Sequence, residues 1–383
     1  MKEKKSALLC PLDWGIGHAT RCVPIIKALQ DAGYHVIAAT GGRSLQFLKK
    51  ECSGITLYEF PGTAVKYSRS RRLLLKMIWF TPAFCIGIWR EHQTLKKMVR
   101  RFKPALIISD NRYGCWHREI PSVFITHQVS IRVPASIKFL ERPLNRINHW
   151  FIHQYDECWI PDFEPHNGLA GALSHPVRLP INAYYIGILS RFSPYTGLSE
   201  NREEPLVNLV VMLSGPEPQR TILEEKILNE LENINIRVII IQGITENDET
   251  KKVNDRIHIF SHLDTKKMAR LVQNAEMVIC RSGYSSIMDM VTLGKRAIFI
   301  PTPGQTEQEY LARTLMKKKI FFSMDQERFN LLYAMEMSNN YPGMVIRNDY
   351  AILRERIAGL STRFFSQRPV NQYDSRQDKR DGQ

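Results

Sequence analysis

The fold is decided by residues 6–40, which read SALLCPLDWGIGHATRCVPIIKALQDAGYHVIAAT. The apolar run 6–12 predicts a β-strand, and residues 18–32 repeat apolar side chains at helical spacing. Gly33 is placed to end that helix, and residues 34–40 read as a second strand. Strand, helix and strand in this order form the basic unit of a parallel α/β sheet.

The same alternation continues along the chain and then begins again. In the first half, further strands are expected at Ile55–Phe60, Ala105–Asp110 and Ser122–Thr126. In the second half, the predicted strands are Val207–Leu213, Ile236–Gln242, Arg256–Phe260, Met277–Cys280 and Ala297–Ile300. The predicted helices there are Thr221–Glu232, one capped by Asp264, and one that starts at Thr306. The sequence therefore predicts an α/β protein with two Rossmann-like domains, joined near residues 185–205 and facing a cleft. Ligands of such sheets bind beyond the carboxyl ends of the strands.

The net charge and the cysteine content indicate the kind of partner and the cellular compartment. The 383 residues carry a formal net charge of +15, which favours an anionic partner or is simply a solvated basic surface. Seven scattered cysteines fit neither a disulfide framework nor a zinc site, so a reducing, cytoplasmic location is expected.

Residues 69–89 combine arginines with an apolar, aromatic run that Lys76 and Pro82 interrupt. The run is too short and broken to predict a transmembrane helix. It fits an interfacial patch on an anionic membrane or a buried helix pair in the N-terminal domain.

The turn at residues 13–21 follows the first strand and opens the first helix. Gly15 and Gly17 allow the backbone to approach a ligand, and the free amides of the helix start favour an anion. Asp13 and His18 stand at the cleft edge, where either could accept a proton, although His18 could instead cap the turn. Thr20 replaces the third glycine of a dinucleotide fingerprint, so NAD binding is weakly supported.

Three turns of the second half carry groups suited to a nucleotide sugar. Residues 280–286 open a helix, and the first backbone amides of that helix can hold a diphosphate. Asp289, one turn later, can accept hydrogen bonds from ribose hydroxyls. Alternatively, it is a surface aspartate that the helix dipole favours. Gln308 and Glu309 can reach sugar hydroxyls, although Thr306 and Glu309 also form a capping-box pattern. After the strand at 207–213, Ser214 and Gly215 can contact phosphate, and two nearby prolines argue against a P-loop.

Together these turns resemble the MurG-like branch of glycosyltransferases, family 28 with the GT-B fold. The likeness is strongest at Cys280–Gly283, Asp289, Gly294, Pro301 and Gln308–Tyr310, and weaker at 15–18, 127–128 and 187–191. Asp289 stands where the family usually has glutamate, and Glu309 where MurG has a second glutamine. The acceptor-side loops do not look like those for a peptidoglycan lipid, so the chain is not expected to be MurG itself.

The resemblance implies a UDP-sugar donor such as UDP-N-acetylglucosamine, with a hexose or N-acetylhexosamine transferred. Residues 1–187 would form the acceptor domain, 188–349 the donor domain, 350–362 a helix packed back on the first domain, and 363–383 a flexible tail. By this likeness, the residues expected on the donor side are Arg191, Ser214, Gly215, Leu263, Arg281, Ser282, Gly283, Tyr284, Ser285, Asp289, Gln308 and Glu309. Those expected on the acceptor side are Gly15, Gly17 and His127.

The expected reaction is inverting transfer to the hydroxyl of a glycan or lipid-linked acceptor, with His18 as base and Asp13 as second choice. No Asp-x-Asp cluster occurs in the sequence, so neither a metal nor another cofactor is expected. The protein would act at the inner face of the cell membrane. The alternatives are a non-hydrolysing UDP-sugar epimerase, a basic nucleic-acid-binding protein and a non-catalytic nucleotide-sugar-binding protein. The chain shows no recognisable nucleic-acid module, so nucleic acid is not an expected partner.

Overall fold

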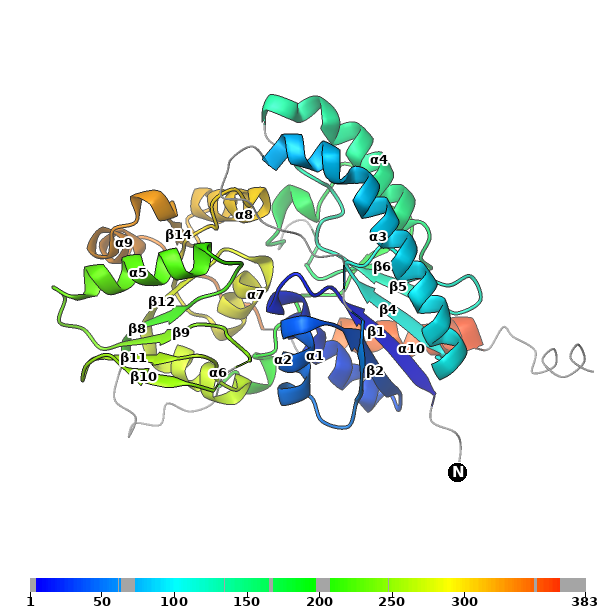
Figure 1. The fold of residues 1–383 in the computed structure, drawn as a ribbon, viewed down its shortest axis with the longest axis horizontal. Coiled ribbons are helices and arrows are strands. Elements are labelled where there is room, and N and C mark those ends of the chain that lie inside the picture. The colour runs from blue at the N-terminus through cyan, green and yellow to red at the C-terminus, as the bar shows by residue number, and fades with distance from the viewer. Residues whose placement is uncertain are drawn as a thin grey trace, which may run out of the picture.

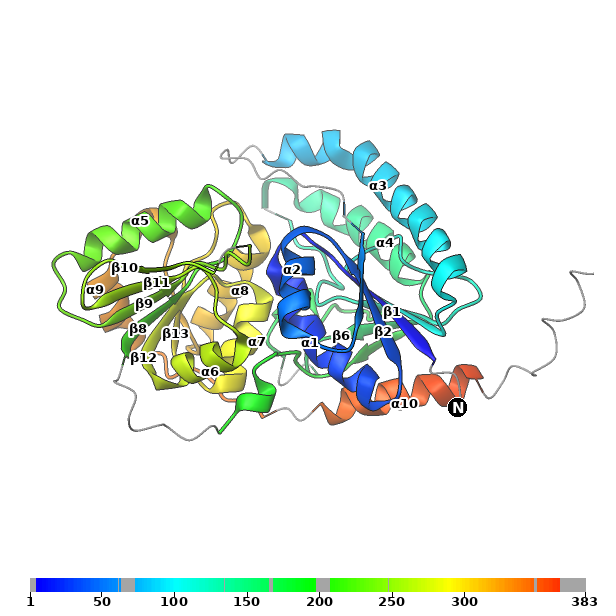
Figure 2. The same ribbon diagram turned by 60° about the horizontal axis from the view of Figure 1, so that its bottom comes forward.

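A computed structural model describes residues 5–60, 62, 73–133, 135–164, 168–197, 207–246, 248–347 and 350–365. Figures 1 and 2 show two α/β layers side by side, each a sheet with helices packed around it. In Figure 1 the first half of the chain, coloured blue to cyan, lies on the right, and the second half, green to orange, lies on the left.

The first sheet is entirely parallel, with strand order β3-β2-β1-β4-β5-β6-β7 in the described part of the chain. Its strands are β1 Ser6–Pro11, β2 His35–Thr40, β3 Thr56–Glu59, β4 Leu106–Asp110, β5 Ser122–Ile125, β6 Glu157–Ile160 and β7 Ala183–Tyr185. The helices of this half are α1 Ile16–Asp31, α2 Gly42–Glu51, α3 Leu73–Phe102 and α4 Glu141–Ile152, with short 3-10 turns η1 Ala135–Leu140 and η2 Gly171–Leu173. The strand order reverses between β1 and β4, where a parallel sheet offers its binding crevice.

The second sheet has strand order β10-β11-β9-β8-β12-β13-β14, parallel except for the β10–β11 pair. Its strands are β8 Val207–Met212, β9 Val238–Ile241, β10 Thr250–Lys252, β11 Ile257–Phe260, β12 Ala275–Cys280, β13 Ala297–Phe299 and β14 Phe322–Ser323. The helices are α5 Gln219–Leu231, α6 Thr265–Asn274, α7 Tyr284–Leu293, α8 Thr306–Lys317 and α9 Leu331–Ser338, with η3 Ser193–Tyr195 and η4 Gln326–Arg328. This sheet reverses its order between β8 and β12.

Helix α10, Ala351–Phe365, returns to the first half and packs against α1, as Figure 2 shows along the lower edge of the molecule. One cluster of buried apolar residues runs through both halves and includes Ile25 of α1, Ile287 of α7 and Leu360 of α10. Burial of such side chains contributes roughly 1.5–3 kcal/mol each, so this shared core holds the two halves together. The helix extends to Phe365, three residues beyond its expected end, and the rest of the expected tail lies outside the described residues.

The predicted fold class is confirmed. The predicted strands, and the predicted helices other than α10, lie within two residues of the observed ones. Four strands were missed: β6, β7, β10 and β14, each of two to four residues. Helix α3 is thirty residues long and continues through Pro82. A proline inside a helix removes one backbone hydrogen bond, and the other turns of α3 remain. Arg69, Arg71 and Arg72 lie outside the described residues.

Candidate active site

A cavity of about 490 Å³ lies between the two halves, at the carboxyl ends of both sheets. From the first half it is lined by the turn after β1, by the start of α1, and by residues that follow β4 and β5. From the second half it is lined by the turns after β8 and β12 and by the start of α8. The predicted position of the site, in the cleft between two Rossmann-like sheets, is therefore where the structure has its cavity.

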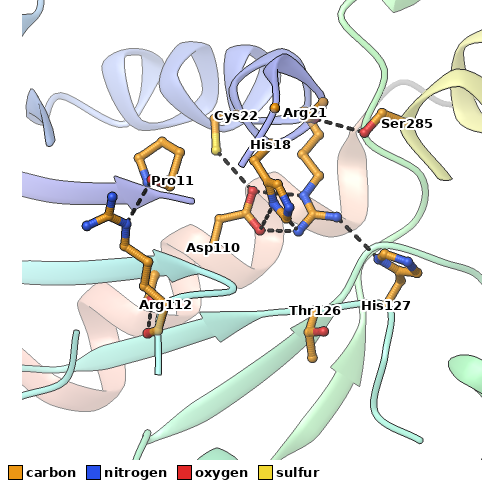
Figure 3. Close-up of polar contacts among 12 residues, drawn as sticks. Pro11, His18, Arg21, Cys22, Asp110, Arg112, Thr126, His127 and Ser285 are labelled. Carbon is orange, nitrogen blue, oxygen red and sulfur yellow. Dashed lines mark hydrogen bonds and ion pairs between the residues drawn. The ribbon is translucent and has the colours of Figure 1, made fainter. Parts of the chain in front are cut away.

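His18, on the first turn of α1, lines this cavity and contacts a buried ion pair. Its Nδ1 lies 3.2 Å from Oδ1 of Asp110, the last residue of β4, and 3.0 Å from Nη2 of Arg21. Arg21 donates from Nε to Oδ2 of Asp110 over 2.8 Å and from Nη2 to Oδ1. Figure 3 shows His18 and Arg21 reaching down from α1 to the Asp110 carboxylate.

The charges of this cluster favour a neutral histidine beside a charged carboxylate. Burial lowers the pKa of His18 below its ordinary value, although Asp110 opposes that effect. Burial alone would raise the pKa of Asp110, but the charge of Arg21 and the hydrogen bonds from Arg21 and His18 hold the pKa well below its ordinary value. Nδ1 of His18 lies near both a donor, Nη2 of Arg21, and an acceptor, Oδ1 of Asp110. In the tautomer that donates from Nδ1 to Asp110, Nε2 keeps a lone pair, the arrangement required of a general base.

Asp13, the second candidate base, faces a different group of residues. Its Oδ2 accepts from the backbone amide of Gly62 over 2.9 Å, and its Oδ1 lies 3.5 Å from Nη2 of the buried Arg112. It is absent from the residues that line the cavity. Asp13 therefore fixes the turn after β1, and the geometry favours His18 as the proton acceptor.

Gly15 and Gly17 bring the first turn close to the second half of the chain. Gly15 caps α1 in an extended conformation, and Gly17 presents its carbonyl to Ser285, whose Oγ donates to it over 2.8 Å. A Cβ at position 17 would lie only 3.1 Å from that Oγ. The glycine thus permits the close approach of α1 to α7, two helices that pack against each other.

The turn around Gly283 is the N-cap of α7 and lines the cavity together with Tyr284, Ser285 and Asp289. Arg281 and Ser282 do not line it. The Arg281 guanidinium donates to the carbonyls of Gln219, Ile300 and Pro301, and Ser282 Oγ donates to the Gln308 carbonyl. These two residues therefore hold the loops of the site in place, while the free amides at the start of α7 face the cavity.

Arg191 and Asp289 lie at the same end of the cavity. Burial raises the pKa of Asp289 to about 6, although Arg191 and the hydroxyl of Ser190, which donates to Oδ1 over 2.5 Å, oppose that shift. Arg191 is 5% exposed, and its Nε is buried without a hydrogen-bond partner among the described residues. Its Nη atoms contact the Thr265 hydroxyl at 3.3 Å and the Met268 sulfur at 2.9 Å. A buried guanidinium with weak partners is suited to receive an anion.

Ser214 and Gly215 line the cavity after β8, and Gly215 adopts φ +98°, a left-handed conformation that favours glycine. Leu263 does not line it, whereas the preceding His262 does. Both ring nitrogens of His262 are buried without a hydrogen-bond partner in the part of the chain that the structure describes. The segment predicted around Leu263 therefore reaches the cavity through a residue that sequence reasoning missed.

In the first turns of α8, Gln308 lines the cavity and Glu309 does not. Gln308 accepts from the backbone amide of Thr302 over 2.9 Å and donates to the Gln305 side chain. Glu309 accepts from the Gly304 amide over 3.2 Å and pairs with Arg313. The expected capping box of Thr306 and Glu309 is wrong, because Gln305 is the N-cap and its side chain makes no capping bond.

His127 lines the cavity as expected, stacked on the Tyr284 ring at a centroid distance of 4.3 Å. Its Nε2 lies 2.9 Å from Oε1 of Glu307, and Gln128 donates to Oε2 of the same carboxylate. Sequence reasoning assigned no role to Asp110, Arg21 or Glu307. One signal was available in the sequence for Arg21, which follows His18 by three residues, about one helical turn.

The chain is similar in sequence to known glycosyltransferases. Residues 217–333 match the family described as Glycosyltransferase family 28 C-terminal domain. An uncharacterized glycosyltransferase of Methanosarcina acetivorans is 22% identical over 311 residues, covering 77% of this chain and 79% of that protein. The UDP-N-acetylglucosamine--N-acetylmuramyl-(pentapeptide) pyrophosphoryl-undecaprenol N-acetylglucosamine transferase of Listeria monocytogenes serotype 4b is 23% identical, covering 79% and 81%.

Solved structures share the fold. MurG of Acinetobacter baumannii superposes with a TM-score of 0.53 at 13% identity, covering 93% of this chain and 99% of that one. The glycotransferase of kitacinnamycin superposes with a TM-score of 0.59 at 12% identity, covering 94% and 95%. The chain thus has the GT-B fold, and the match to the family 28 domain together with relatives named as glycosyltransferases supports a glycosyltransferase. The predicted resemblance to the MurG-like branch is confirmed, and identities near 22% are consistent with a MurG-like protein that is not MurG itself.

Proposed function

We propose that this protein transfers a hexose or N-acetylhexosamine from a UDP-sugar to an acceptor hydroxyl, with inversion at the anomeric carbon. One observation carries the proposal: a single cavity joins the His18–Asp110 pair of the first half to the Gly283 turn, Asp289 and Arg191 of the second. The first group suits removal of a proton, and the second suits a nucleoside diphosphate.

In this proposal the donor lies along the second half of the cavity. The amides at the start of α7 and the Arg191 guanidinium hold the diphosphate, and Ser214 and Gly215 flank it. The Asp289 carboxylate accepts from the ribose hydroxyls, while residues 262–263 contact the base. Gln308 meets the sugar. The buried, weakly partnered Arg191 supports this orientation, since a diphosphate supplies the acceptor oxygens that it lacks.

The chemical step then follows from the two ends of the cavity. The acceptor oxygen attacks the anomeric carbon while Nε2 of His18 takes its proton, and the bond from that carbon to the diphosphate oxygen breaks. The negative charge that develops on UDP is stabilised by Arg191 and the α7 amides, so the proposed reaction uses no metal. Asp110 stabilises the imidazolium that forms.

The acceptor is proposed to be a glycan or a lipid-linked molecule reached from an anionic membrane surface. Phe84 and Ile88 of α3 line the cavity, while Trp89 on the same helix is 61% exposed. Trp150 of α4 is 59% exposed. Exposed tryptophans on a protein of net charge +15 suit the interface of an acidic bilayer. No helix in the described residues is long and apolar enough to cross a membrane.

A thermal-shift screen across nucleotide sugars, followed by a transfer assay with candidate acceptors, tests the proposed function. A ligand that binds the native state raises the midpoint of unfolding, so UDP-sugars should give the largest shifts. A larger shift with another base would contradict the UDP assignment. Conversion of UDP-N-acetylglucosamine to another sugar without an acceptor would instead identify an epimerase.

A further inference from the structure

One ionised group of the cavity has no part in the proposed chemistry. Glu307, in the first turn of α8, comes from the second half but bonds to His127 and Gln128 of the first. Its side chain is 32% exposed and lines the cavity. The carboxylate therefore lies where the donor-sugar residue Gln308 meets the acceptor side.

The partners of Glu307 hold it in place without cancelling its charge. Arg21, which is always a donor, lies 3.3 Å from Nδ1 of His127, so that nitrogen must accept and the ring proton is on Nε2. His127 is then neutral and donates to Glu307, as the Gln128 amide also does. Arg21 itself is balanced by Asp110.

Glu307 is a carboxylate at neutral pH. Burial alone would raise its pKa, but contact with His127 and the proximity of His18 and Arg21 hold the pKa below its ordinary value. The N-terminus of α8 also favours negative charge there. A carboxylate has about four lone-pair sites, so two remain for hydroxyl groups of a ligand.

The cavity is thus lined by groups of both signs, with Arg191 near Asp289 and with Glu307 next to Gln308 in the sequence. Arg191 and the start of α7 supply positive potential where the diphosphate is proposed to bind, and Glu307 supplies a negative charge beside the sugar. We propose that Glu307 is a specificity-determining residue that restricts the transferred group to sugars without a carboxylate, such as neutral hexoses. This inference rests on the proposed function. A sugar carboxylate in this position would face a like charge, whereas a hydroxyl can donate to it.

The test compares two donors that differ only at C6 of the sugar, UDP-glucose and UDP-glucuronate. Calorimetry should show that wild-type protein binds UDP-glucose at least about tenfold more tightly than UDP-glucuronate, because like charges a few ångströms apart repel by more than about 1.4 kcal/mol in a protein site. In Glu307→Gln the preference should fall by at least about tenfold, since the substitution removes the charge and keeps the shape. The oxygen of the new amide can still accept from His127, and its nitrogen can donate to a reoriented Gln128.

Glu225→Gln is the matched control, because Glu225 is exposed on α5 in the same half of the chain and does not line the cavity. It should leave the preference unchanged. Equal affinity of wild-type protein for the two donors would overturn the inference whether or not the variant folds, and so would an unchanged preference in Glu307→Gln. Failure of UDP itself to bind would overturn the donor site and this inference together. The two failures can be told apart. If only the proposed role of Glu307 is wrong, UDP and UDP-glucose still bind.

Discussion

Replacing His18 by alanine tests the proposed base. A general base contributes about 10²- to 10⁴-fold to the rate, which corresponds to a barrier increase of about 3–5 kcal/mol. Two carboxylates of the first half are poor substitutes for this base. Asp110 is paired with Arg21, which holds its pKa well below the ordinary value, and Asp13 faces Gly62 and Arg112. We therefore expect kcat to fall by at least about a hundredfold.

Donor affinity should not follow kcat in this variant. The groups proposed to hold UDP, namely Arg191, the Gly283 turn and Asp289, all lie on the donor side of the cavity. Calorimetry should give a Kd for UDP within about twofold of wild type, while steady-state UDP release with acceptor gives kcat. His153→Ala, a change at an exposed histidine that does not line the cavity, is the control and should alter neither quantity. A kcat within a few-fold of wild type in His18→Ala would refute the assignment.

Three further predictions concern Asp289, His18 and Asp110. Asp289→Ala should weaken UDP binding by about 2 kcal/mol, roughly thirtyfold, because the ribose loses a charged acceptor; unaltered affinity by calorimetry would contradict the ribose role. Burial lowers the pKa of His18, and the neutral ring is the proposed base. We therefore expect kcat to stay high at pH 7 and to fall only as the pH drops through a value below 6.5. A pH–rate profile in which kcat already falls above pH 6.5 would contradict this. Asp110→Ala should lower the free energy of unfolding by about 3–5 kcal/mol, because Arg21 is 2% exposed and loses its counter-ion. Urea denaturation measures this change. A loss of less than about 1 kcal/mol would contradict a strongly stabilising Arg21–Asp110 ion pair.

Most of the strands and helices could be predicted from the spacing of apolar residues in the sequence. Long apolar strands such as β1 and β8 lie between Gly-rich turns and amphipathic helices, so their positions follow from periodicity alone. The four missed strands are short edge or near-edge segments of their sheets, where pairing with a neighbour decides the conformation.

The site was predictable where a strand–turn–helix unit carries its own ligand groups. His18, Gly283 and Gln308 lie at helix starts, Asp289 lies in the second turn of α7, and all four line the cavity. Arg281, Ser282 and Glu309 share those turns, yet their side chains point to carbonyls or amides of neighbouring loops, which sequence spacing does not reveal.

The residues that were missed depend on contacts between distant parts of the chain. Asp110 meets His18 across 92 positions, and Glu307 meets His127 across 180. Such pairs arise only when parallel strands and the two halves are assembled, so neither propensity nor local motif predicts them.

The central claim is that the cleft binds a uridine diphosphate sugar with its phosphates against the start of α7. A crystal structure with UDP bound tests this most directly. We expect the diphosphate within hydrogen-bond distance of the Gly283–Ser285 amides and of Arg191, with the ribose at Asp289. Diphosphate density elsewhere in the molecule, or an empty cleft at saturating UDP, would contradict it.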